Sequence, residues 1–485
     1  MDIYIAGIVV YLGLLIGIGV YKSRAVKTQD DFMVAGRNAS ALFLAGTLVC
    51  TWIGSGSLFG GAGLAFRMGF SELWMSAGAW VGIAIVYFLA HRVRRIAQYT
   101  VSDILERRYN AAARLFGTSA IIIAYLTIAG YQFRGGGRLL NILTGIDPLV
   151  GGAITCAVVI IFTVLAGLVS IIALDLLNGI MMTLGVLIAV PLVLAGIGGT
   201  VQVAALPADR FEIFGQHNII WAMGVFFPTF FLLLGESSMY QKFFAARDEA
   251  TARKAVVGMI IGVVLIESAL CALAVFGSAK YLTLGPFALP GGSLDKAATE
   301  TIILHLARFD LPVWAGVLLI CAGVAIILST ANTFLMIPST NIARDIYQRF
   351  INPDVSQQGI IRFQRIWIVV LGVAAFVLAN FFKSILDMAF TAYTMVGAGI
   401  TPALLAAFLW KRVTVAGGVT SIVVGMGVTL LITVVNLVLA VPLMDTDYII
   451  LPAAGSSILC LVVVSLLTPP SPEDKWKPFM ENMGR

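Results

Sequence analysis

Residues 50–66 read CTWIGSGSLFGGAGLAF, and this stretch lies inside an otherwise apolar segment. It carries five glycines, at positions 54, 56, 60, 61 and 63. Glycine destabilises a helix interior by about 1 kcal/mol relative to alanine, so a segment that only had to cross a membrane would favour leucine here. We therefore expect these residues to interrupt a helix for a reason other than spanning.

The composition of the chain indicates an all-α membrane protein. Its 485 residues are 60% hydrophobic and 12% charged, whereas soluble domains carry about 25% charged residues. Apolar runs recur at the roughly 20 residues that a membrane-crossing helix needs. We expect about thirteen spans, at residues 3–21, 42–66, 71–91, 115–138, 146–168, 171–197, 219–241, 253–279, 312–342, 363–382, 386–409, 415–440 and 447–468.

The formal net charge of +6 is interpreted as a sign of topology rather than of nucleic-acid binding. Most lysines and arginines fall on one side of the thirteen spans if the N-terminus lies outside, and basic loops favour the cytoplasm. We expect an inner-membrane protein with a cytoplasmic C-terminus, functional as a monomer, whose partners are the lipid bilayer, a small solute and an ion.

Several functional classes lack support in the sequence. The five cysteines lie in apolar runs without the spacing of a metal or redox site, and we expect them to pack as small hydrophobic groups. The sequence has no Walker A motif, so an ATP-driven pump is not indicated. No nucleophile–base pairing emerges either, so we do not expect an enzyme. A transporter driven by an ion gradient is the class that remains.

A second interrupted helix is predicted at the start of the second half of the chain. Residues 221–244 read WAMGVFFPTFFLLLGESSMYQKFF, with Pro228 and Gly235 inside the apolar run. Interrupted helices at matching positions of two halves indicate a transporter binding site, because the freed backbone groups must find partners inside the membrane. The alternative is that the glycines only allow close helix packing.

Hydroxyl and amide side chains cluster in residues 328–347, LSTANTFLMIPSTNIARDIY. Ser329, Asn332 and Thr333 share one helix face, and Thr330 lies beside them. Their neutral oxygens suit a hard cation, although such side chains also bond to the preceding helical turn.

Asp175 is the acidic candidate, since an acid near the centre of a membrane helix is functional by default. Asn178 lies one turn later on the same face. Glu236 abuts the second predicted break and could carry a proton instead of sodium coupling, as could Asp175. Glu267 lies near no motif, and we interpret it as a packed, hydrogen-bonded acid.

Four stretches resemble the sodium solute symporter family, which includes sodium/glucose, proline, choline and sialic acid transporters. They are DFMVAGRN (31–38), LDLLNGIMM (174–182), YQKFFAARDEATARKA (240–255) and the serine-rich stretch 328–347 with its Arg-Asp-Ile-Tyr ending. The last of these is the most specific.

The resemblance implies a LeuT-like core of five plus five helices in inverted repeat. On this plan residues 1–40 hold an extra helix and a cytoplasmic loop, and residues 41–200 form the first repeat. Residues 201–412 form the second repeat, 413–470 two further helices and 471–485 a cytoplasmic tail.

The resemblance also implies ion-binding residues. The family's common sodium site matches the backbone carbonyls of Cys50, Ile53 and Ile326 and the hydroxyls of Ser329 and Thr330. A second sodium site, present in some members, matches Asp175, Ser329, Asn332 and Thr333. Asparagine stands where the family often has serine, and it still offers an oxygen.

The expected solute-binding residues are Trp52, Ser57, Trp74, Arg134, Thr229, Leu232 and Tyr393. The polar lining of sugar-transporting members is largely missing, so a hexose is disfavoured. Trp52 occupies a position where choline transporters place tryptophan, and an indole face attracts a quaternary ammonium. Arg134 falls where sialic acid transporters bind a carboxylate with arginine, but it could instead extend to the membrane surface.

The sequence thus predicts a sodium-coupled symporter that imports a small organic solute by alternating access, with a zwitterion or carboxylate favoured over a sugar. A proton-coupled carrier of the same fold and a transporter of choline-like amines are the alternatives.

Overall fold

The computed structural model describes residues 2–23, 33, 35–96, 98–165, 168–282, 286–289, 293–439 and 441–480. All regular elements in these ranges are helical. Eleven helical segments are long and apolar enough to cross a membrane, and two shorter apolar helices cover Ile3–Gly19 and Ala41–Trp52. Together these thirteen segments match the thirteen predicted spans. The second predicted span corresponds to Ala41–Trp52 and the start of the 41-residue segment Gly56–Ile96, and the rest of that segment is the third span.

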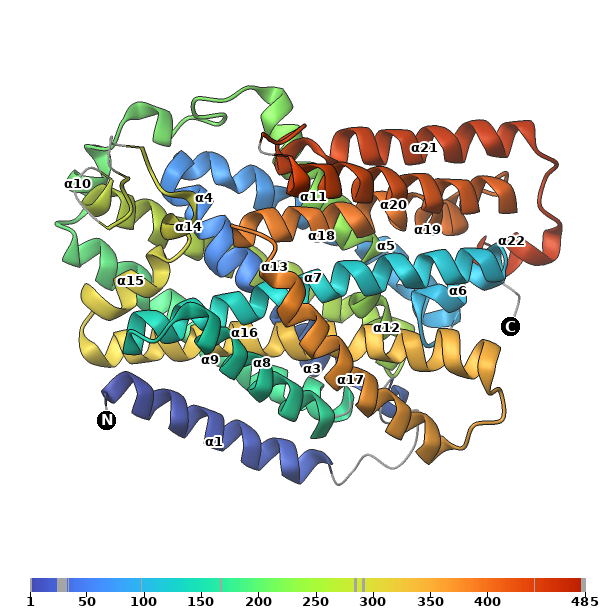
Figure 1. The fold of residues 1–485 in the computed structure, drawn as a ribbon, viewed down its shortest axis with the longest axis horizontal. Coiled ribbons are helices and arrows are strands. Elements are labelled where there is room, and N and C mark those ends of the chain that lie inside the picture. Colours follow the sequence, from blue (N-terminus) through green and yellow to red (C-terminus); the bar gives the residue numbers. More distant parts are fainter. Residues whose placement is uncertain are drawn as a thin grey trace.

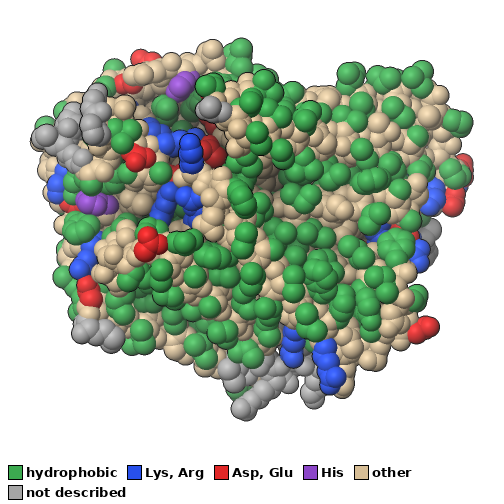
Figure 2. All heavy atoms as spheres, viewed as in Figure 1, with side chains coloured by type: hydrophobic (Ala, Val, Ile, Leu, Met, Phe, Trp, Pro, Cys, Tyr) green, Lys and Arg blue, Asp and Glu red, His purple; other side chains and the backbone are tan. Residues whose placement is uncertain are grey.

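The helices run mainly along one direction, which is horizontal in Figure 1. Helix α1 (Ile3–Ser23) begins at the left end of the bundle, whereas α22 (Glu473–Met480) lies at the right end (Figure 1). An odd number of crossings places the two ends of a chain on opposite sides, as seen here. Hydrophobic side chains cover the middle of the face in Figure 2, and most charged side chains lie around its margins.

The first half of the core begins with a helix in two pieces. These are α3 (Ala41–Trp52) and a π-helical turn, η2 (Gly56–Gly61), that continues into α4 (Ala62–Met68). The remaining helices of this half are α5 (Leu73–Ile96), α7 (Ala111–Thr144), α8 (Pro148–Leu165) and α9 (Leu168–Gly196).

The second half also begins with a helix in two pieces, α11 (Ile219–Gly235) and α12 (Ser237–Ala245). It continues with α13 (Glu249–Tyr281), α16 (Val313–Thr340), α17 (Gln357–Ala379), α18 (Ile385–Gly399) and α19 (Thr401–Leu409). Two helices follow the core, α20 (Val415–Val438) and α21 (Ile450–Leu467).

The two breaks have nearly the same backbone conformation. Ile53 ends α3 with φ −74° and ψ 98°, and Glu236 ends α11 with φ −71° and ψ 107°. Both residues are extended rather than helical, so both predicted interruptions are present. Pro228 lies within α11 and does not end it; the second break follows Gly235 instead.

Helix α16 forms the centre of the bundle. Each of its residues from 319 to 340 is buried, and α16 packs against α7 and α9. A helix that is buried on every side presents all of its polar side chains to other helices rather than to lipid. The hydroxyl groups of α16 are therefore available to the first break.

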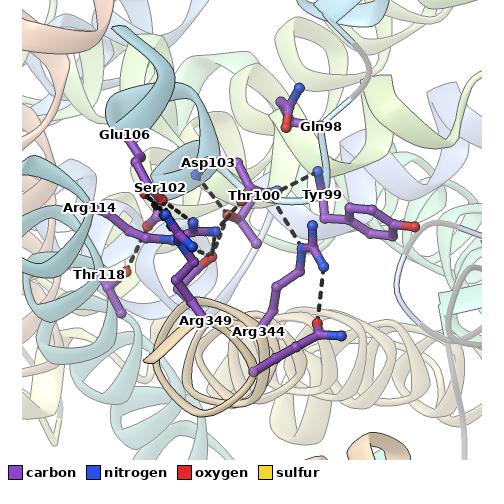
Figure 3. A network of polar contacts seen from close by, with 12 residues as sticks. Gln98, Tyr99, Thr100, Ser102, Asp103, Glu106, Arg114, Thr118, Arg344 and Arg349 are labelled. Carbon is purple, nitrogen blue, oxygen red and sulfur yellow. Dashed lines mark hydrogen bonds and ion pairs between the residues drawn. The ribbon is translucent and has the colours of Figure 1, made fainter. Parts of the chain in front are cut away.

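An ion-paired cluster ties the base of α7 to two neighbouring elements (Figure 3). Arg114 of α7 is buried and pairs with Asp103 and Glu106 of α6 (Val101–Arg108). It also donates a hydrogen bond of 2.8 Å to Asp345, in the π-helical turn η5 (Asn341–Ile351) that follows α16. One guanidinium thus holds three carboxylates from two separate segments.

Glu106 lies at the edge of this cluster. Burial opposes its ionisation, but a hydrogen bond from Arg349 and the charge of Arg114 lower the pKa of Glu106 below its ordinary value. Glu106 is therefore a carboxylate at neutral pH, as the pairing requires.

Replacing Arg114 by methionine should destabilise the protein by about 3–5 kcal/mol, because removal of one partner leaves buried carboxylates without a counter-charge. The measurement is thermal unfolding of the purified protein in detergent. Arg349→Met is the matched control: its half-exposed side chain pairs with the same Glu106, and exposed pairs contribute about 0–1 kcal/mol. Equal losses in the two variants would contradict this view of the cluster.

Candidate functional site at the first helix break

Backbone carbonyls freed by the first break face two hydroxyl groups of α16. Thr330 Oγ1 donates to the carbonyl oxygens of Cys50 and Ile53, both at 3.1 Å. Ser329 Oγ lies 3.1 Å from the same Cys50 oxygen and 3.3 Å from the carbonyl oxygen of Ile326. All five residues are buried. The structure therefore brings the predicted first sodium set together at one point.

The donor set is suited to a monovalent hard cation. It consists of neutral oxygens only, which sodium, magnesium and calcium prefer over nitrogen or sulfur. Hydroxyl oxygens have lone pairs as well as a proton and can turn them toward an ion. The absence of a carboxylate from this set disfavours divalent ions, which are usually bound by acidic side chains.

The predicted second sodium set is less compact. Asp175 accepts a hydrogen bond of 2.5 Å from Thr47 of α3. Asn332 instead accepts from Thr163 of α8 at 2.9 Å. Thr333 lies 3.4 Å from the hydroxyl of Thr51. In the described part of the chain these side chains point to different partners rather than to one another.

Lys242 of α12 lies beside this second set, and sequence reasoning missed it. Its Nζ donates to the carbonyl oxygen of Thr47 at 3.0 Å and to the hydroxyl of Thr51, and the side chain is fully buried. Thr47 and Thr51 are the same residues that contact Asp175 and Thr333. A fixed positive charge is therefore placed next to the predicted second ion site. A lysine inside the apolar run 240–245 could have indicated it.

Glu267 of α13 is buried and hydrogen-bonded, as its sequence interpretation as a packed acid expected, but its partners were not foreseen. Its Oε1 accepts from the indole of Trp52 at 2.9 Å and from the hydroxyl of Ser57 at 3.4 Å. Its Oε2 accepts from the indole of Trp80 at 2.7 Å. The predicted solute residues Trp52 and Ser57 therefore meet at a carboxylate. The sequence gives no local motif around Glu267, and only its position in an apolar helix indicated function.

Two tyrosines close the other side of the break. The hydroxyls of Tyr131 (α7) and Tyr393 (α18) lie 3.4 Å apart. A Cβ atom added to Gly56 would lie 2.3 Å from the Tyr393 oxygen, so only glycine allows this approach. This contact explains one of the glycines in the stretch 50–66.

Unused hydrogen-bonding groups lie next to the same break. The amide oxygen of Gln132 accepts from the backbone N–H of Ser55 at 2.9 Å. Among the described residues, however, the amide nitrogen of Gln132 and the hydroxyl of Ser55 have no partner, although both are buried. Buried polar groups are nearly always paired, so these two are available to a bound molecule.

Three of the predicted solute residues are engaged elsewhere in this conformation. Thr229 donates to the carbonyl oxygen of Met75 at 2.6 Å, and Trp74 donates to that of Ile213 at 2.8 Å. Arg134 donates to carbonyl oxygens near the end of α17, including that of Ala379 at 3.0 Å. Leu232 is buried within α11.

Large cavities lie away from the break. One of about 540 Å³ is lined by residues of α18, of α20 and of the loops beside them, including Asp387, and by Lys296 of α14 (Lys296–Thr299). Another of about 500 Å³ is bordered by Arg134, Arg138 and Lys383. Figure 2 shows basic and acidic side chains in a hollow on the left part of its face.

The sequence profile of the sodium:solute symporter family matches residues 32–425, which include both breaks and all of the candidate residues. The chain belongs to this family. It is therefore a membrane transporter and not an enzyme.

Curated relatives span nearly the whole chain. The high-affinity proline transporter PutP of Bacillus subtilis is 26% identical over 94% of this chain and 96% of its own length. The osmoregulated proline transporter OpuE of the same organism is 24% identical over 95% and 94%. A sodium/proline symporter of Salmonella typhimurium is 24% identical over 86% and 85%.

Solved structures show the same fold. A Na+-coupled sialic acid symporter in a substrate-bound outward-open state superimposes with a TM-score of 0.83 at 18% identity, covering 97% of this chain and 99% of that one. MhsT in complex with L-phenylalanine gives a TM-score of 0.55 at 13% identity, covering 88% and 98%. The LeuT-like fold that the resemblance implied is confirmed.

Gly56→Ala should lower uptake of the solute at least tenfold, because the added methyl overlaps the Tyr393 hydroxyl and overpacking of this kind costs about 1–3 kcal/mol. Adding Tyr393→Phe removes that hydroxyl and should restore part of the activity. Gly427→Ala is the matched control, since no atom lies within 4 Å of its added Cβ. Normal uptake by Gly56→Ala would contradict the close approach.

Proposed function

We propose that this protein is a sodium-coupled symporter that binds one sodium ion and one small zwitterionic solute, of the amino-acid type, at the first helix break. The observation that carries the proposal is the convergence of three backbone carbonyls and the hydroxyls of Ser329 and Thr330. An ion bound there links α3 to α16, so ion binding and closure of the break become one event.

Lys242 supports a stoichiometry of one sodium rather than two. Its ammonium already occupies hydrogen bonds with Thr47 and Thr51, beside Asp175 and Thr333. A second cation at those residues would meet this fixed charge, and like charges repel strongly in a low-dielectric interior. We therefore assign Asp175 and Lys242 to mutual charge balance in this conformation.

A single sodium is sufficient for accumulation of a neutral solute. One elementary charge that crosses 100 mV gains about 2.3 kcal/mol, and a tenfold gradient corresponds to about 1.4 kcal/mol. The membrane potential alone then sustains a gradient of roughly 45-fold, to which the sodium concentration gradient adds.

A zwitterion fits the charges and free groups near the break. The Glu267 carboxylate and the indole of Trp52 favour a cationic group on the solute. The amide nitrogen of Gln132 and the hydroxyl of Ser55, which have no partner in the part of the chain that the structure describes, are donors for a carboxylate. The named relatives transport proline, a small solute with both charges. We assign Arg134 a structural role, because its guanidinium already donates to carbonyl oxygens at and just after the end of α17.

We further propose that the N-terminus lies outside, so that the large charged cavities form the external entrance. The Arg114 cluster then lies on the cytoplasmic side. A quaternary amine would use Trp52 but leave the donors of Gln132 and Ser55 unpaired, and a proton-coupled carrier would not need the neutral oxygen set. Both are outcomes of the experiments below.

Ser329→Ala and Thr330→Ala should each raise the sodium concentration for half-maximal uptake. A hydrogen-bonding group to a charge is worth about 1.5–3 kcal/mol, which corresponds to a roughly ten- to hundredfold increase. The assay is uptake into proteoliposomes at fixed pH. Ser339→Ala is the control, because this hydroxyl is buried in the same helix but donates to Met336 within α16. Unchanged sodium dependence in both site variants would refute the assigned ion site.

Gln132→Glu should raise the half-saturation concentration of the solute about tenfold or more. The variant keeps an oxygen for the backbone N–H of Ser55, but it replaces the free amide donor with an acceptor that repels a carboxylate. Arg134→Met serves as the comparison and should have a smaller effect. A larger effect of Arg134→Met than of Gln132→Glu would move the carboxylate site to the arginine.

A further inference from the structure

Two buried carboxylates from different elements border one small cavity beside the first break. Glu72 lies at the end of a short 3₁₀ turn (Gly69–Glu72), and Glu267 lies in the middle of α13. The cavity measures about 10 Å³, which is the room for a single water-sized species. Its lining includes both glutamates, Ser57, Gly61, Ser76 and Cys271.

Neither carboxylate has a basic partner among the described residues. Glu72 interacts with the charge of Glu267, the Cys271 thiol and the Ser76 hydroxyl. Glu267 interacts with the indoles of Trp52 and Trp80 and with the hydroxyls of Ser57 and Ser76. Two like charges in one buried site cannot both be ionised without a counter-charge, so the pair needs one positive charge from outside the protein.

The hydrogen-bond donors are divided unequally between the two side chains. Glu267 accepts two indole N–H bonds, at 2.9 and 2.7 Å, and a hydroxyl bond at 3.4 Å. Glu72 accepts a bond from the Ser76 hydroxyl at 3.3 Å and contacts the weakly donating Cys271 thiol, and among the described residues its Oε2 has no hydrogen-bond partner. Donors favour the ionised form of a carboxyl group, and their absence favours the protonated form. The two environments therefore give the two groups different roles.

Close approach of the backbone keeps the cavity small. A Cβ atom added to Gly61 would lie 3.0 Å from Glu72 Oε1. Both oxygens of Glu267 already accept indole N–H bonds, and these N–H groups would repel a sodium ion placed against the same oxygens. A proton fits without further ligands.

We propose that Glu72 and Glu267 form a proton-binding site, in which Glu72 is the protonated acid and Glu267 the carboxylate, and that one proton must be bound there for the break to close around the solute. The site is separate from the sodium site at Ser329 and Thr330. Its link to transport is direct, because Trp52 and Ser57, on either side of the break, both donate to Glu267.

The titratable groups around the pair are few. From α13 the Cys271 thiol contacts Glu72, and from α18 the Tyr393 hydroxyl lies close enough to interact with Glu267. The hydroxyls of Ser57 and Ser76 and the two indoles complete the surroundings from η2, α5 and the break. Cysteine and tyrosine ordinarily lose their protons only in alkaline solution, so the glutamate pair sets the pH response.

The first test is sodium-driven uptake as a function of pH, and this arm rests on the proposed function. At saturating sodium, wild-type uptake should fall as pH rises, by up to tenfold per unit once the proton is lost. Glu72→Gln keeps a neutral side chain at every pH, so its uptake should lose the alkaline decline, and the ratio of its uptake at high pH to its uptake at low pH should stay near one. Glu249→Gln is the control: it lies on the same α13 in a surface pair with Arg95 and should keep the wild-type profile.

The second test needs no transport. Infrared spectroscopy of the purified protein should show the carbonyl band of a protonated carboxylic acid at neutral pH, and part of this band should disappear in Glu72→Gln but not in Glu249→Gln. This arm separates the inference from the proposed function, since it can succeed even if uptake proves independent of sodium.

Three results would overturn the proton site. They are a flat wild-type pH profile, an unchanged decline in Glu72→Gln, and an infrared band that persists in that variant. A raised sodium half-saturation in Glu72→Gln at every pH would show that the pair holds sodium instead.

Discussion

The structure depends on the contact between the broken helix α3 and the central helix α16. A membrane offers no water to backbone groups, so carbonyls freed by a break must be satisfied within the protein. At Cys50 and Ile53 this is achieved by two hydroxyls, those of Ser329 and Thr330. A hydroxyl group can donate a hydrogen bond to a carbonyl oxygen and can also coordinate a cation through its lone pairs. The same four residues can therefore satisfy the break without an ion and bind an ion with it, which is what a coupled carrier requires.

Two buried charges, Lys242 and Glu267, contact the helix before the break. Lys242 bonds to Thr47 and Thr51 of α3 on the side facing α12, and Glu267 bonds to Trp52 at the end of α3. Each charge thus touches a residue of the short helix before the break. Movement of that helix would change the partners of both charges at once. Electrostatic interactions are strong in this environment, so we expect the position of α3 to depend on the occupancy of the proposed ion and solute sites.

Much of this arrangement follows from the sequence, and the reasons are physical. The spans were predictable because apolar length is constrained by the bilayer, and the first break because five glycines stand where leucine would serve. Gly56 shows why, since the Tyr393 hydroxyl takes the place of a side chain there. The roles of Lys242 and Glu267 were not predictable, because their partners lie on helices distant in sequence. Arg134 of α7 bonds to carbonyl oxygens near the end of α17. The sequence of α7 alone does not reveal where α17 ends, so this contact could not be predicted.

The measurement that tests the account most directly is solute uptake into proteoliposomes under an inward sodium gradient, repeated with potassium in place of sodium at the same pH. The solutes are a labelled panel of amino acids including proline, with betaines, carboxylates and a hexose for comparison. The account predicts accumulation of an amino-acid zwitterion in sodium only. Equal uptake in the two salts, or sodium-dependent uptake of the hexose alone, would contradict it.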